Sequence, residues 1–112
     1  MNAAPDRRVE LAAGLADTER RIVDACTAAG RSRDEITLVV VTKTYPASDV
    51  EILAELGVVD VGENRHPEAG DKAQDVEAPM RWHFLGGLQT NKAGAVARYA
   101  DLVHSVDRVK LV

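Results

Sequence analysis

The chain has 112 residues, of which 46% are hydrophobic and 29% are charged, and this composition is ordinary for a globular domain with one core. Its net charge of −4 argues against a nucleic-acid binder, because neutralising phosphates requires a basic face. The single cysteine, Cys26, excludes an internal disulfide, and no apolar run approaches the roughly 20 residues of a membrane-spanning helix, so we expect a cytoplasmic protein.

The first predicted element is a long amphipathic helix from Arg8 to Ala29. Apolar residues recur along it at steps of four and seven, which places them on one face. The residues of this face are Leu11, Leu15, Ile22 and Cys26. Gly30 is the expected C-terminal cap, because glycine readily adopts the left-handed conformation that ends many helices.

Four short apolar runs follow this helix and are predicted to be strands. The first, Ile36 to Lys43, is rich in β-branched residues and is typical of a strand buried on both faces of a parallel sheet. The other three runs are Val58 to Val61, Arg81 to Leu85 and Leu102 to Val106.

Helices are predicted between these strands. The first begins with the capping-box spacing of Ser48 to Glu51 and stops at Gly57. The second runs from Pro67 to about Asp75. The third is capped by Thr90-Asn91, and Asp107 is expected to cap a further helix. The apolar face of the third helix consists of Val96, Tyr99 and Ala100.

This alternation of strands and helices predicts the fold class. It implies right-handed βαβ crossovers and a parallel sheet, and no linker or low-complexity tract interrupts it, so we expect one α/β domain over residues 1–112. In parallel α/β folds the ligand lies at the carboxyl ends of the strands. The functional residues are therefore expected at those ends.

Polar residues stand at all four predicted strand ends. Asn64, in the turn Gly62-Glu63-Asn64, can hold a planar heteroaromatic ring or satisfy backbone groups of its own loop. His83 faces away from its two aromatic neighbours and is either a ligand contact or a satisfied core histidine. The same two interpretations apply to Ser105.

Lys43 is the most informative of these residues, because it follows an uncharged run and so emerges from the sheet. A lysine partly removed from water more readily loses its proton, and the neutral amine is the form that attacks an aldehyde. The alternative is a solvated lysine, or one paired with Glu63.

Taken together, four segments give the chain a recognisable pattern. They are Val41-Thr42-Lys43-Thr44, Gly62-Glu63-Asn64, the stretch WHFLGGLQTNK at 82–92, and Val103-His104-Ser105-Val106-Asp107. In this order they resemble the YggS/PROSC family of pyridoxal phosphate homeostasis proteins, whose pattern includes a "KT" strand end, a "GEN" turn, "WHFIG.LQ.NK" and "H.S.D". The resemblance covers nearly the whole chain.

The resemblance implies a (β/α)8 TIM-type barrel like the N-terminal domain of alanine racemase, with pyridoxal 5'-phosphate held as a Schiff base on Lys43. It also implies a role in supplying, buffering or regulating the pool of this cofactor, without established catalytic turnover. Asn64, His83 and Ser105 match family positions that line the cofactor side of the barrel.

Two departures from the family stand out. After the GEN turn many relatives continue with an aromatic residue and a "QE" pair, whereas Arg65-His66-Pro67-Glu68 stands here. A complete barrel has eight strands and about 250 residues, so this chain is expected to be the N-terminal half, four parallel strands with flanking helices and a long N-terminal helix. The half expected to hold the cofactor's phosphate is absent.

Three other functions remain open. A racemase-like enzyme would need a second acid/base group and a partner for the pyridine nitrogen, and neither is assignable here. A phosphate-binding module with an open flavodoxin-like sheet would need a glycine-rich loop where Lys43-Thr44-Tyr45-Pro46 stands. A truncated family member that binds no cofactor is the third.

Partners follow from the half-barrel. Four strands cut from a closed barrel leave two unpaired edges and an uncovered apolar face, which we expect a second copy or a complementing fragment to cover. Pyridoxal phosphate is the expected small-molecule partner, and no nucleic acid or membrane is expected.

Overall fold

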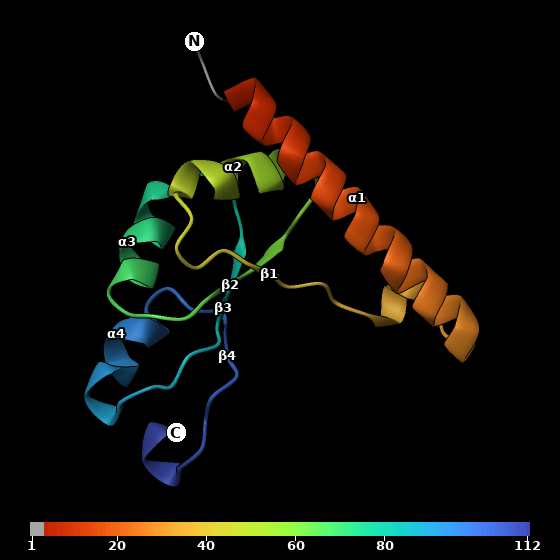
Figure 1. Cartoon of the computed structure of the whole chain (residues 1–112). Helices are drawn as coiled ribbons and strands as arrows, with labels where there is room; N and C mark the ends of the chain where they lie inside the picture. Colours follow the sequence, from red (N-terminus) through yellow and green to blue (C-terminus); the bar gives the residue numbers. More distant parts are fainter. Residues whose placement is uncertain (1–3) are drawn as a thin grey trace. The chain divides into compact units, whose positions relative to one another are not determined.

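A computed structural model of the chain describes residues 4–112, so the first three residues of the sequence lie outside it. The described chain divides into two compact units, with the boundary in the sequence between Leu38 and Val39. The first unit contains α1 (Ala4–Ala29) and the short 3-10 helix η1 (Arg33–Glu35), and the second contains the sheet (Figure 1). The prediction of a single domain over residues 1–112 stays a prediction.

Helix α1 confirms the predicted long helix and begins four residues before the predicted start. Of the predicted apolar face, Leu11, Leu15 and Ile22 are partly buried and Cys26 is buried. The helix ends as expected at Gly30, whose φ of 68° is left-handed. The Arg31 amide donates to the Cys26 carbonyl at 2.9 Å and the Gly30 amide to Thr27 at 3.3 Å, which is the hydrogen-bond pattern of a Schellman motif.

The second unit is built on four parallel strands, as predicted. They are β1 (Val40–Val41), β2 (Asp60–Glu63), β3 (Arg81–Phe84) and β4 (Leu102–Val103). Their order in the sheet is β1-β2-β3-β4, the same as in the chain. A doubly wound, flavodoxin-like sheet reverses its strand order at a switch point, whereas a barrel does not. The sequential order is therefore that of half a (β/α)8 barrel.

Helices stand between the strands and after the last of them (Figure 1). Helix α2 spans Ala47–Glu55 and α3 spans Glu68–Asp75. The third connection contains the 3-10 helix η2 (Thr90–Lys92) followed by α4 (Ala93–Ala97), and the 3-10 helix η3 (Val109–Leu111) follows β4.

One face of the sheet packs on these helices through two apolar clusters. Val61 and Trp82, which are adjacent in the register of β2 and β3, pack with Val50 of α2 and Val76. Phe84 lies two residues after Trp82 and therefore on the same face, where it packs with residues of α3 and α4. The residues between them, His83 and its register partner Gly62, belong to the opposite face, which we call the second face.

The strands are shorter than predicted or displaced. Strand β1 covers only two residues of the predicted run Ile36 to Lys43, because a strand requires a ladder partner and only Val40 and Val41 pair with β2. Val41 is 46% exposed, so this strand is not buried on both faces. The predicted strand Val58 to Val61 begins two residues later, since the Val58 amide is still bonded to the Leu53 carbonyl at the end of α2.

The predicted N-terminal caps of the helices were wrong. Pro46 is the N-cap residue of α2 with no side-chain cap, and the Glu51 carboxylate instead accepts hydrogen bonds from the amides of residues 77 and 78. Thr90-Asn91 lies inside η2, and the N-cap residue of α4 is Lys92. Asp107 pairs with Arg108, which is the N-cap residue of η3. The side chains predicted as caps could bond either to the start of a helix or to other groups, and the tertiary contacts of the fold determined which bonds form.

Strands β1 and β4 are the edges of the sheet, and each carries an exposed apolar residue, Val41 at 46% and Leu102 at 42%. Whether another copy of the chain or a separate fragment covers them stays a prediction. Among the described residues 4–112, no helix has the length and apolarity needed to span a bilayer.

Candidate functional site

The carboxyl ends of β1 and β2 enclose a cavity of about 470 Å³. Residues of the β1–α2 turn, the end of β2, the β2–α3 loop and α3 line it, and these are Lys43, Thr44, Tyr45, Glu63, Asn64, Arg65, Glu68 and Lys72. The volume lies within the range of small-molecule sites. Two of the four predicted site residues, Lys43 and Asn64, therefore line one cavity.

Lys43 stands in a tight turn directly after β1. The Tyr45 amide donates to the Thr42 carbonyl at 3.1 Å, which closes the turn around Lys43 and Thr44. Lys43 is exposed rather than partly removed from water, and its amine makes no hydrogen bond or ion pair within residues 4–112. An amine without a competing partner is available to react.

Glu63 is not the partner of Lys43. Its carboxylate accepts a hydrogen bond from the Lys72 ammonium at 2.9 Å and another from the Thr42 hydroxyl. The side chains of this ion pair are nearly buried, with exposures of 11% for Lys72 and 4% for Glu63. Lys72 also donates to the Thr42 carbonyl at 2.8 Å. A buried pair satisfied in this way is a structural clamp between α3, β2 and β1.

Asn64 and Ser105 meet the same neighbour, Gly86, from two sides. The Ser105 hydroxyl donates to the Gly86 carbonyl. A Cβ atom at Gly86 would lie 2.0 Å from the Asn64 carbonyl oxygen, so the loops after β2 and β3 are in direct contact. Asn64 is also part of the lining of a second cavity, of about 360 Å³, between these loops.

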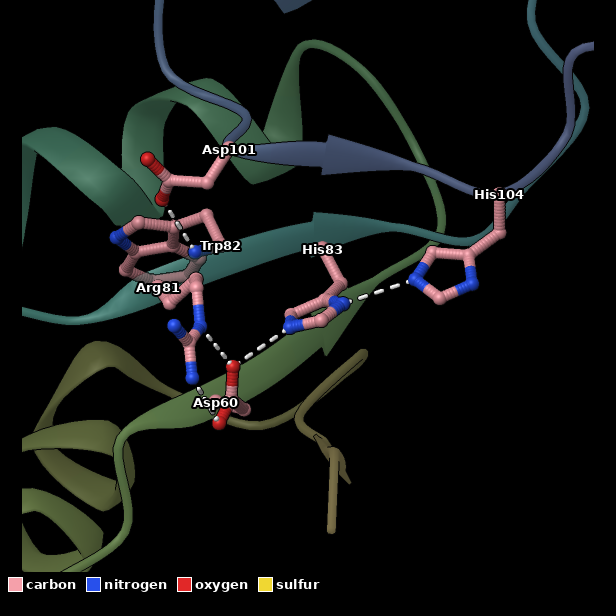
Figure 2. Close-up of polar contacts among 6 residues, drawn as sticks. All are labelled: Asp60, Arg81, Trp82, His83, Asp101 and His104. Carbon is pink, nitrogen blue, oxygen red and sulfur yellow. Dashed lines mark hydrogen bonds and ion pairs between the residues drawn. The ribbon is translucent and has the colours of Figure 1, made fainter. Parts of the chain in front are cut away.

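His83 is buried on the second face, in a chain of polar contacts that runs from β2 to the end of β4 (Figure 2). Its Nε2 lies 2.8 Å from Asp60 Oδ1, and its Nδ1 lies 2.8 Å from His104 Nε2. Arg81 binds both oxygens of Asp60, at 2.5 and 3.0 Å. His83 is therefore satisfied by protein groups, whereas His104 is an exposed residue.

The hydrogen bond from Arg81 lowers the pKa of Asp60 to about 2, and the bond from His83 acts in the same direction while burial opposes both. Because this pKa lies below the unfolded value of 3.8, the contribution of Asp60 to stability is present above about pH 4 and is lost as the pH falls through about 2.

We expect the urea midpoint of the chain to fall between about pH 4 and pH 2 by more than that of the D60N variant. In the free energy of unfolding, the two proteins should differ in their loss by on the order of 1 kcal/mol. The value is small because Arg81 is half-exposed and solvent screens its ion pair with Asp60. Urea titrations of both proteins across this range measure it. Parallel curves for the two proteins would show that Asp60 is not the titrating group.

Three residues of this region were missed by sequence reasoning: Lys72, Asp60 and His104. Lys72 belonged to a helix predicted only as polar, and His104 was noted only as part of a motif. The available signal was Asp60, a charged residue inside the apolar run at 58–61, since a charge in a buried strand requires a partner.

Comparison with known sequences gives close relatives. Over its whole length the chain is 42% identical to a pyridoxal phosphate homeostasis protein of Mycobacterium tuberculosis, of which it covers 48%. Over 91% of its length it is 38% identical to the Escherichia coli protein of the same name, of which it covers 45%. The chain thus spans about half the length of the curated relatives it matches. No family model matches it.

Solved structures give the same fold. The crystal structure of an unknown protein from Bifidobacterium adolescentis superposes on 99% of the chain with a TM-score of 0.82 and 29% identity, and the match covers 49% of that protein. PipY of Synechococcus elongatus, solved with PLP bound, superposes on 80% of the chain with a TM-score of 0.65 and 31% identity, and the match covers 43% of it.

Proposed function

Because this chain is homologous along its whole length to about half of a pyridoxal phosphate homeostasis protein, we propose that it binds pyridoxal 5'-phosphate and serves the homeostasis of that cofactor. The cofactor would be held as a Schiff base on Lys43. In that condensation the lysine nitrogen attacks the aldehyde carbon, a C=N bond replaces the C=O bond, and one water leaves. Because this bond forms reversibly, the chain could store the aldehyde cofactor and release it again.

One observation carries this proposal: Lys43 lines a cavity of about 470 Å³, and its amine has no hydrogen-bond or ion-pair partner within residues 4–112. The nearby carboxylate, Glu63, is already occupied by Lys72. A lysine engaged in an ion pair would first have to break it before reacting, whereas Lys43 has no such barrier.

We expect pyridoxal phosphate followed by borohydride to modify Lys43 and to leave Lys72, Lys92 and Lys110 largely unmodified. Lys72 is held by Glu63, and Lys92 and Lys110 do not line the cavity of about 470 Å³, although Lys92 lines the second cavity of about 360 Å³. Peptide mapping measures the distribution. The variant K43M should lose the imine absorbance while keeping the circular dichroism spectrum of the parent, because an exposed turn side chain contributes little to stability. Even modification of all four lysines would contradict the assignment.

We assign the remaining cofactor contacts to Asn64, His83 and Ser105. Asn64 has the strongest support, because it lines the same cavity as Lys43. Ser105 is linked to the Asn64 loop through Gly86. His83 is the least direct of the three, since both of its ring nitrogens already have protein partners, and a ligand would meet His104 at the end of that chain.

We further propose that the bound chain does not turn over amino acids. The relatives are named as homeostasis proteins rather than enzymes, which supports this proposal. We therefore expect no cofactor-dependent interconversion of alanine enantiomers above background. Chiral chromatography of the loaded protein measures this, and sustained interconversion that disappears in K43M would make the chain an enzyme.

A further inference from the structure

The turn that presents Lys43 contains a conformation that its sequence does not favour. Thr44 has a φ of 69°, in the left-handed region, and it is the only residue other than glycine with a positive φ in the described chain. A β-branched residue in this region is strained, and such strain persists only where surrounding contacts enforce it. The contacts that hold this turn therefore determine where the Lys43 amine lies.

The turn is held at one atom, the Thr42 carbonyl oxygen. It accepts the Tyr45 amide at 3.1 Å, which closes the turn, and the Lys72 ammonium at 2.8 Å. The same ammonium binds Glu63 at 2.9 Å. The Thr42 hydroxyl donates to that carboxylate as well, and Thr42 is 2% exposed. Thr42 is thus fixed through both its backbone and its side chain.

We propose that Lys72, fixed by Glu63, is a positioning residue for Lys43. Its ammonium holds the Thr42 carbonyl so that the strained turn forms and keeps the Lys43 amine at the cavity. Lys72 itself does not react, because Glu63 and Thr42 occupy it. This inference rests on the proposed function of Lys43 and adds a second lysine whose role is to place the first.

The test removes both charges of the pair, since removing one would leave a buried charge uncompensated. In the double variant E63Q/K72M, we expect the initial rate of Lys43 modification by pyridoxal phosphate and borohydride to fall roughly tenfold. Hydrogen exchange of the Tyr45 amide should accelerate, because the turn opens more often. The matched control is K92M, an exposed lysine outside the pair, which should leave both measurements unchanged.

The variant T44G provides a second background for the same test. It distinguishes an effect of the Glu63–Lys72 pair on the position of Lys43 from a general loss of structure. Glycine adopts a positive φ without strain, so in T44G the turn depends less on the clamp. The same E63Q/K72M change should therefore slow Lys43 modification by less than about threefold in T44G. Equal slowing in both backgrounds, or wild-type modification and exchange in E63Q/K72M, would overturn the inference. If pyridoxal phosphate does not select Lys43 in the parent chain, the proposed function fails. The inference is then tested separately by the effect of E63Q/K72M on hydrogen exchange of the Tyr45 amide, measured with Thr44 and with T44G.

Discussion

Replacing Gly86 by alanine should destabilise the sheet unit by about 3 kcal/mol, the upper part of the range for overpacking a closely packed site. The added Cβ would lie 2.0 Å from the Asn64 carbonyl oxygen and 2.9 Å from the carbonyl carbon. These are backbone atoms, so the loop after β2 would have to move. Urea titration of G86A against the parent measures the loss.

The neighbouring glycine is the control for this prediction. A Cβ at Gly87 would meet no atom within 4 Å, and its φ is not in the left-handed region. We expect G87A to change the free energy of unfolding by less than about 0.5 kcal/mol. Equal stability of G86A and G87A would mean that the loops after β2 and β3 do not approach each other as described.

Replacing Lys72 alone by methionine should destabilise the sheet unit by about 3–5 kcal/mol, because it leaves the Glu63 carboxylate buried without a counter-charge. Glu63 is 3% exposed, and the hydrogen-bond donor that remains to its carboxylate is the Thr42 hydroxyl. Adding E63Q removes the charge and should restore at least half of the loss. Thermal and urea unfolding of the two variants measure both values.

The contradicting result is a single variant K72M that is as stable as E63Q/K72M. It would show that the Glu63 carboxylate reaches water or is protonated in the folded chain. K92M, in which an exposed lysine is replaced, should remain within about 0.5 kcal/mol of the parent.

The parts of the fold that depend on local periodicity could be predicted from the sequence. Helix α1 and its end at Gly30 follow from apolar spacing and from the conformational freedom of glycine, and both were confirmed. The order of strands and helices followed from alternating patterns in the same way. The extent of β1 did not, because a strand ends where its ladder partner ends, and that partner lies 21 residues further along the chain.

The candidate site shows the same division. The strand ends that carry Lys43 and Asn64 were predicted, because parallel strands bring their carboxyl ends together. The pairing of Glu63 with Lys72 was not, since Lys43 and Lys72 are both lysines near Glu63 and only the packing of α3 decides between them. The predicted environment of Lys43 was wrong because β1 is an exposed edge and not an interior strand.

The contacts around His83 have a direction that the bond lengths alone do not express. With a pKa of about 2, Asp60 is ionised at neutral pH and can only accept hydrogen bonds, so His83 Nε2 must carry a hydrogen. When both rings are neutral, His83 Nδ1 is then an acceptor, and His104 Nε2 supplies the hydrogen between them. The remaining nitrogen of His104, Nδ1, is left with a lone pair. A hydrogen-bond donor can bind at that end of the chain, whereas an acceptor can bind there only if a proton accompanies it.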